Sequence, residues 1–153
     1  GDILSDAFYK PVNQWCEAHG KRYTAHLKGE ETLFFQTSCS GSLYQNLKQI
    51  NVPAVDALER YPGNHYYPRT VSSLSRQFSD GRCMAEALGG SGWGLSPADL
   101  ENYEDWLEER GIDTIAFPLW LYQADSASVR DWHPNIHRGL SQKEAASAVF
   151  GKL

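Results

Sequence analysis

The chain has 153 residues, enough for one hydrophobic core but fewer than the about 250 residues of a complete eight-unit (β/α) barrel. Its 14 Lys and Arg against 19 Asp and Glu give a mildly acidic surface, which disfavours nucleic acid and anionic lipid as partners. No apolar run reaches the roughly 18 residues of a membrane helix, and residues 1–8 lack the basic and apolar regions of a signal peptide. We expect one domain over residues 1–153 that binds neither nucleic acid nor membrane.

Cysteine and aromatic usage narrows the functional classes further. The three cysteines are odd in number and lack C-x-x-C spacing, so neither a disulfide framework nor a zinc site is predicted. Five Trp and eight Tyr residues favour flat surfaces of the kind that bind sugar rings, although core packing is the commoner use of such side chains.

The first half of the chain predicts two helices and two strands in alternation. Ser5 can cap the first helix, Pro11 kinks it or starts its regular part, and Gly20 ends it. Its apolar face is formed by Phe8, Val12, Trp15 and Cys16. A short buried strand at 22–27, a helix at 43–50 and a strand at 52–56 follow.

The second half continues this alternation. A loop at 61–68 precedes a helix at 70–78, a strand at 83–88 and a glycine-rich loop at 89–94. The clearest helix lies between Pro97 and Arg110, because Ser96 and Asp99 have the spacing of a capping box and Gly111 follows as a terminator. A fourth strand at 113–121, a loop at 124–140 and a final helix at 141–150 complete the prediction.

Alternating strands and helices, with little period-two pattern in the strands, indicate an α/β fold with a parallel sheet buried on both faces. Right-handed crossovers place the carboxyl ends of all strands at one edge, where such sheets bind ligands. The side chains that we expect at this edge are Glu30, Glu31, Asp56, Glu86, Trp93, Trp120 and Tyr122.

Glutamates at this edge suggest glycoside hydrolysis, which uses one carboxyl group as an acid and a second as nucleophile or base. Glu86 interrupts an apolar strand, where an unpaired charge is costly, so it is either functional, in solvent, or paired with Arg22 or Arg82. Glu30 and Glu31 are either solvated loop residues or the source of the second carboxyl, with Glu30 preferred of the two.

Three further residues have both a functional and a structural interpretation. His26 could donate to a sugar hydroxyl or orient a carboxylate, or be a hydrogen-bonded core histidine. Trp93 could stack on a sugar ring or pack its loop against the sheet. Asp56 could be a third acid in the cleft, a strand-end cap, or a calcium ligand together with a carboxylate of the acidic pair. No other cofactor is expected.

Several short motifs occur together between residues 8 and 122. They are Phe8-Tyr9, Trp15-Cys-Glu-Ala-His-Gly20, Thr24-Ala-His-Leu27 with Gly29-Glu-Glu31, Val52-Pro-Ala-Val-Asp56, Ser72-Ser73 with Gln77, Ala85-Glu-Ala87 with Gly92-Trp93, and Asp105-Trp-Leu107 with Arg110-Gly-Ile112. This combination resembles bacterial glycoside hydrolases with a (β/α)₈ catalytic domain, of the α-L-rhamnosidase-like group. The resemblance implies a partial barrel, acidic positions at Glu86 and at Glu30 or Glu31, and cleft positions at His26 and Trp93.

Two functions remain open at this point. The chain is either part of a glycosidase that hydrolyses O-glycosidic bonds, or a non-catalytic carbohydrate-binding or interaction fragment of one. Because a partial barrel exposes unpaired strand edges and apolar surface, a homodimer through the open sheet edges is also expected.

Overall fold

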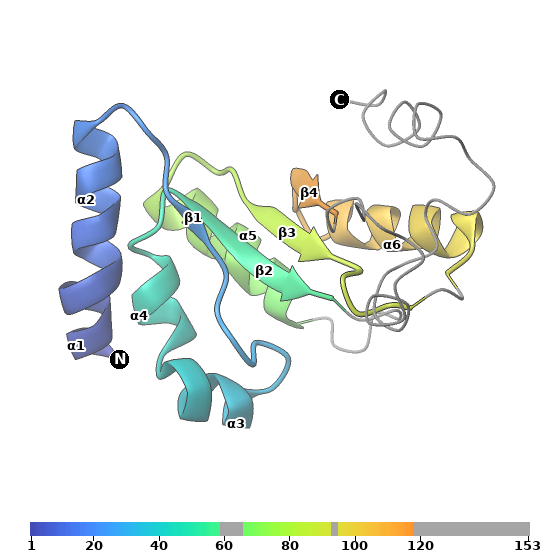
Figure 1. Ribbon diagram of the computed structural model, residues 1–153, viewed down its shortest axis with the longest axis horizontal. Coiled ribbons are helices and arrows are strands. Elements are labelled where there is room, and N and C mark those ends of the chain that lie inside the picture. The colour runs from blue at the N-terminus through green and yellow to red at the C-terminus, as the bar shows by residue number, and fades with distance from the viewer. Residues whose placement is uncertain (59–65, 93–94, 118–153) are drawn as a thin grey trace, which may run out of the picture.

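The computed structural model describes residues 1–58, 66–92 and 95–117, which form an α/β fold with four parallel strands in an open sheet (Figure 1). The strands are β1 (Thr24–Ala25), β2 (Val52–Ala57), β3 (Met84–Ala87) and β4 (Thr114–Ala116), and they are neighbours in the order β1-β2-β3-β4. The order follows the chain and never reverses, so the predicted parallel βα units are confirmed. Such an order lacks the reversal at which doubly wound sheets bind their ligands.

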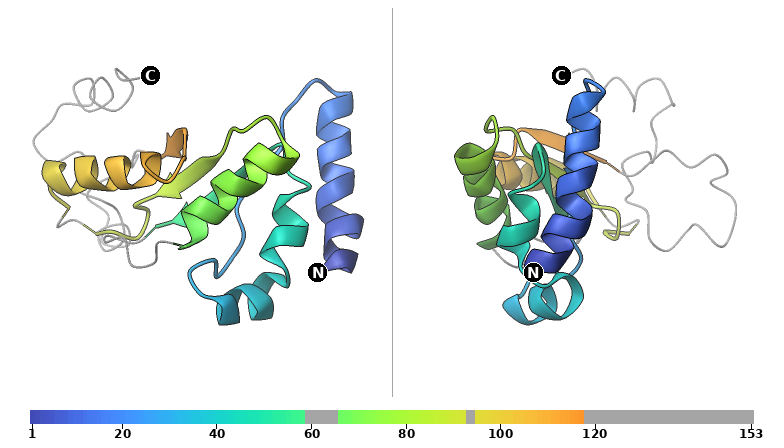
Figure 2. Two further views of the ribbon diagram at one scale, coloured as in Figure 1. Left: turned by 180° about the vertical axis from the view of Figure 1, so that it is seen from behind. Right: turned by 90° about the vertical axis from the view of Figure 1, so that its left-hand side faces the viewer.

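The helices connect and cover these strands. In chain order they are α1 (Asp2–Leu4), the π-helical η1 (Ser5–Tyr9), α2 (Lys10–Ala18), α3 (Leu33–Phe35), the π-helical η2 (Gln36–Ser40), α4 (Leu43–Leu47), α5 (Tyr66–Phe78) and α6 (Pro97–Glu108). Seen from behind, α5 lies across the sheet and α6 continues the same layer (Figure 2). Within the described parts of the chain, no helix is long and apolar enough to cross a membrane.

The hydrophobic core lies between the sheet and this helix layer. Val55 and Ala57 of β2 and Ala85 and Ala87 of β3 are fully buried on one face of the sheet. They pack with buried side chains of the helices, among them Leu47, Val71, Leu74, Tyr103 and Leu107. Each strand therefore turns alternate residues toward the helices.

The opposite face of the sheet is only partly covered, which corrects the expectation of burial on both faces. Asp56, Met84 and Glu86 alternate with the core residues and are half-buried, and Thr114 is exposed. Successive right-handed crossovers in one direction place their helices on the same side of a sheet. This open face is where the polar residues of the strands gather.

Local hydrogen bonds explain why the start of α6 agrees closely with the prediction. At the start of α6 the Ser96 hydroxyl accepts a hydrogen bond from the Asp99 backbone N–H at 3.1 Å. The Asp99 carboxylate accepts one from the Ser96 N–H at 2.9 Å, which completes the capping box.

Two helix starts differ from the prediction. The first helix begins at Asp2, and Ser5 does not cap it but donates a hydrogen bond to the Gln45 carbonyl at 2.6 Å. Pro11 lies in the first turn of α2, as one of the two alternatives proposed. Helix α5 already includes Tyr66, four residues before the predicted start at residue 70. The predicted loop at 124–140 and helix at 141–150 lie outside the described residues.

Candidate functional site

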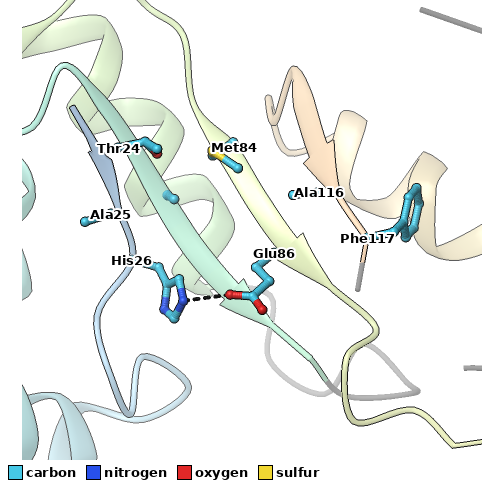
Figure 3. Close-up of a pocket in the computed structure, with 8 residues that line it drawn as sticks. Thr24, Ala25, His26, Met84, Glu86, Ala116 and Phe117 are labelled. Carbon is cyan, nitrogen blue, oxygen red and sulfur yellow. Dashed lines mark hydrogen bonds and ion pairs between the residues drawn. The ribbon is translucent and has the colours of Figure 1, made fainter. Parts of the chain in front are cut away.

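Three polar side chains meet on the open face of the sheet near the strand ends. Asp56 of β2 and Glu86 of β3 are partners in the strand register, and partners in a parallel sheet point to the same side. His26 follows β1, the other neighbour of β2. His26 and Glu86 reach toward each other across β2 (Figure 3), with Nε2 of His26 2.9 Å from Oε2 of Glu86.

The hydrogen-bond partners of His26 determine where its protons lie. Nδ1 of His26 is 3.0 Å from the Leu27 carbonyl oxygen, which can only accept, so Nδ1 carries a hydrogen. The contact between Nε2 and the Glu86 carboxyl group then requires one proton, either on the imidazole or on the carboxyl. His26 and Glu86 therefore share a single proton, and we call them the His26–Glu86 dyad.

The surroundings of His26 favour its charged form. Partial burial lowers the pKa of His26, but the Leu27 carbonyl, the negative charges of Asp56 and Glu30 and the bond to Glu86 together raise it above the ordinary value of 6.5. Oδ2 of Asp56 lies 3.8 Å from Nδ1 of His26. The imidazole thus lies between two carboxyl groups, one on each of two adjacent strands.

A cavity of about 300 Å³ opens beside this dyad (Figure 3). His26 and Glu86 form its polar end, while Met84, Ala116 and Phe117 contribute apolar wall. The volume is at the lower end of the range for small-molecule sites, and apolar walls with a few polar groups are their usual lining. A sugar ring has a matching character, with apolar C–H faces and polar hydroxyl edges.

Glu30 has a different environment from the one that its sequence position suggests. It is fully buried, and its two carboxyl oxygens accept hydrogen bonds from the backbone N–H groups of Leu27 at 2.7 Å and Asp56 at 2.6 Å. Gln36 donates to the Glu30 carbonyl at 2.6 Å. Glu30 therefore connects the segment that follows β1 with strand β2 through two hydrogen bonds, and we call this connection the Glu30 clasp. It fixes the backbone that carries His26 and Asp56.

Burial determines how far the carboxyl group of Glu30 is protonated. Desolvation raises the pKa of Glu30 to about 7, although the N–H groups of Asp56 and Leu27 and the positive charge of His26 oppose the shift. Near neutral pH Glu30 is therefore divided between its neutral and charged forms. Its position inside the protein excludes the solvated-loop alternative for Glu30, while Glu31 is partly exposed.

The structure brings together only some of the residues that the sequence predicts at this edge. Glu86 is paired with His26, whereas Arg22, one of its expected partners, forms an ion pair with Asp80. Trp93, Trp120 and Tyr122 lie outside the described residues. Among the residues that are described, no three His, Cys, Asp or Glu side chains are grouped so as to hold a metal ion.

Met84, Phe117 and Gln36 contribute to the site without having been predicted. Met84 could have been found, because it lies two residues before Glu86 in a strand and must share its face. Phe117 and Gln36 carry no such signal, since sheet geometry and loop packing bring them to the site.

Comparison with known proteins adds no family assignment. No protein-family model, curated protein or solved structure matches the chain.

Proposed function

We propose that the chain forms part of a glycoside hydrolase, and that the cavity on the open sheet face binds one sugar unit of the substrate. The observation that carries the proposal is the shared proton of the His26–Glu86 dyad beside a second carboxyl group, Asp56, on the adjacent strand. Glycoside hydrolysis needs one carboxyl group that can deliver a proton and another that is ionised. The motif resemblance to α-L-rhamnosidase-like glycosidases supports the same reaction class.

In this proposal Glu86 acts as the general acid. In the charged form of His26 the proton of the dyad lies on Nε2, and Glu86, which lines the cavity and is half-exposed, would pass this proton to a glycosidic oxygen there. His26 is a positioning residue, because its Nδ1 is held by the Leu27 carbonyl and its Nε2 holds the Glu86 carboxyl.

Asp56 is the better candidate for the second carboxyl group than either Glu30 or Glu31. It shares the open face and the strand register with Glu86. Both oxygens of Glu30 accept backbone hydrogen bonds inside the protein, so using them on a substrate would break the connection between β1 and β2. Asp56 would act as the nucleophile or activate water, and Glu30 would support it through the backbone.

The alternative is a carbohydrate-binding fragment without catalytic activity. The open edge of the sheet favours it, because four strands cannot by themselves close the wall that a complete barrel builds around a substrate. Such a fragment would keep the cavity and its apolar wall but lack the far side of the site.

The test is hydrolysis of a panel of aryl glycosides, including an α-L-rhamnoside, by the chain and by Glu86→Gln, Asp56→Asn and Glu30→Gln. Glu101→Gln, an exposed acid on α6, is the matched control. We expect the first two substitutions to lower kcat/KM by roughly 10²-fold to 10⁴-fold without loss of folding, and the control to have no effect. Binding of the free sugars without turnover would support the carbohydrate-binding fragment instead. If the folded chain showed no binding and no turnover, both proposed functions would be refuted.

A further inference from the structure

The N-terminal helical segment, α1 to α2, carries apolar side chains that the rest of the described protein does not cover. Leu4, Phe8 and Trp15 are 40%, 52% and 60% exposed. They recur at the spacing of one helix face, and His19 extends the row because its ring stacks on Trp15 at 4.1 Å between centroids. We call Leu4, Phe8, Trp15 and His19 the outer stripe.

The same segment uses another face to pack on its own protein. The buried Ser5 hydroxyl donates to the Gln45 carbonyl of α4, and Tyr9 is packed against the hydrophobic core. The outer stripe is therefore not the face that holds the segment in place. Figure 1 shows the segment as a column at one side of the molecule, with α4 beside it.

A continuous row of large apolar side chains is unusual on a surface that stays in water. Single exposed apolar residues are common, whereas contiguous patches mark interaction sites. Two members of the row are aromatic, and Trp in particular is enriched among the residues that contribute most to interfaces.

We propose that the outer stripe binds the outer stripe of a second copy of this chain in an antiparallel pair of helices. The two-fold axis would pass between Pro11 and Val12. Phe8 then faces Trp15 of the other copy and Leu4 faces His19, because each pair is placed symmetrically about that midpoint in the sequence. A self-complementary surface of this kind is what a two-fold dimer requires.

The charges at the two ends of the segment favour the antiparallel arrangement over the parallel one. Asp2 and Asp6 are exposed near the start of the segment, and Lys21 is exposed just beyond its end. Antiparallel pairing brings Asp2 of one copy close to Lys21 of the other, whereas parallel pairing sets the acidic ends side by side. The same symmetry sets Asp6 opposite Glu17, which is one unfavourable contact, whereas in parallel pairing every charged residue faces its own copy, so all charged contacts are between like charges.

This dimer differs from one through the sheet edges, since it uses a helix surface and leaves β1 and β4 free. It does not depend on the proposed glycosidase activity. Two copies joined in this way would carry two cavities, which increases the avidity for a carbohydrate with repeated units.

Sedimentation velocity over a concentration series tests the proposal directly. We expect a monomer–dimer equilibrium in the native chain and a roughly tenfold or greater increase in dimer Kd for Phe8→Ser and for Trp15→Ser. Phe34→Ser is the matched control, because Phe34 is 74% exposed on α3, away from the outer stripe. A native chain that stays monomeric at 
a concentration of about 1 mM, near the weak end of the affinity scale, would overturn the proposal, as would a dimer that only the control weakens.

Charge exchange and cross-linking test the orientation. Asp2→Lys and Lys21→Asp should each weaken the dimer, and the double variant should restore it. In a Cys16→Ser, Cys39→Ser background, which removes the two native thiols that are not buried, Val12→Cys should form a disulfide-linked dimer on mild oxidation because residue 12 lies next to the axis. A double variant that remains as weak as the single ones, together with no cross-link at residue 12, would refute the antiparallel pair.

Discussion

The side chains of His26 and Glu86 are 60 residues apart in sequence yet join across β2, with Nε2 of His26 2.9 Å from Oε2 of Glu86. Strand order makes this possible, because β1 and β3 both flank β2 and their polar residues share its open face. The Leu27 carbonyl fixes the hydrogen on the other ring nitrogen, so the bond must contain one shared proton.

The first prediction concerns the protonation of His26. Its pKa is raised by the Leu27 carbonyl and the neighbouring carboxyl groups against the effect of burial, so Glu86→Gln should lower it. An NMR titration of the ring C–H signals measures the pKa, with Glu101→Gln as the control. A His26 pKa that is unchanged in Glu86→Gln would mean that the two side chains do not share a proton.

The second prediction is that Glu30→Gln destabilises the fold. The Gln amide keeps one oxygen acceptor but turns an NH₂ group toward a backbone N–H, at Leu27 or Asp56, and two donors cannot pair. We expect a loss of about 1–3 kcal/mol in the free energy of unfolding, measured by urea denaturation. Glu31→Gln, a partly exposed neighbour, should change it by less than about 0.5 kcal/mol. Equal losses in both variants would contradict the clasp.

The third prediction is the pH dependence that Glu30 gives to stability. Its pKa is about 7 in the folded protein and near 4.5 in the unfolded chain, so the folded state holds more protons between these values. Stability from this group is therefore fully present below about pH 4.5 and is lost as the pH rises through 7, by roughly 3 kcal/mol in all.

The raised pKa of His26 acts in the same direction, because its contribution is present below 6.5 and is lost as the pH rises through the folded pKa. The difference in unfolding free energy between the native chain and Glu30→Gln isolates the Glu30 part. This difference should fall as the pH rises from 4.5 to 8. A difference that is constant with pH would show that Glu30 is ionised throughout.

The fourth prediction compares two glycines that both have a positive φ. Gly29, next to Glu30, has φ +77° and Gly20 has φ +64°, a region in which other residues are strained by about 1 kcal/mol. A Cβ at position 29 would lie 2.8 Å from the Cβ of Phe35, whereas one at position 20 would have no atom within 4 Å. Gly29→Ala should therefore lower the melting temperature clearly more than Gly20→Ala. Equal decreases in melting temperature would show that position 29 is not closely packed against Phe35.

Features that depend on nearby residues could be predicted from the sequence. The capping box of Ser96 and Asp99 is formed by groups three residues apart, so the start of α6 follows from the local sequence alone. The order of strands and helices follows from their alternation, and parallel crossovers then place Asp56 and Glu86 at one sheet edge. The sequence by itself thus determined the α/β class and the edge that carries the candidate site.

The tertiary structure decided how those residues are used. Glu30 and Glu31 are indistinguishable in sequence, and only the approach of β2 buries the first of them against the Asp56 N–H. Helix packing likewise covers one face of the sheet, leaves the other for the cavity, and leaves Phe8 and Trp15 in solvent. Burial and partner choice depend on contacts between segments tens of residues apart, whose geometry is fixed only when the strands pair and the core packs.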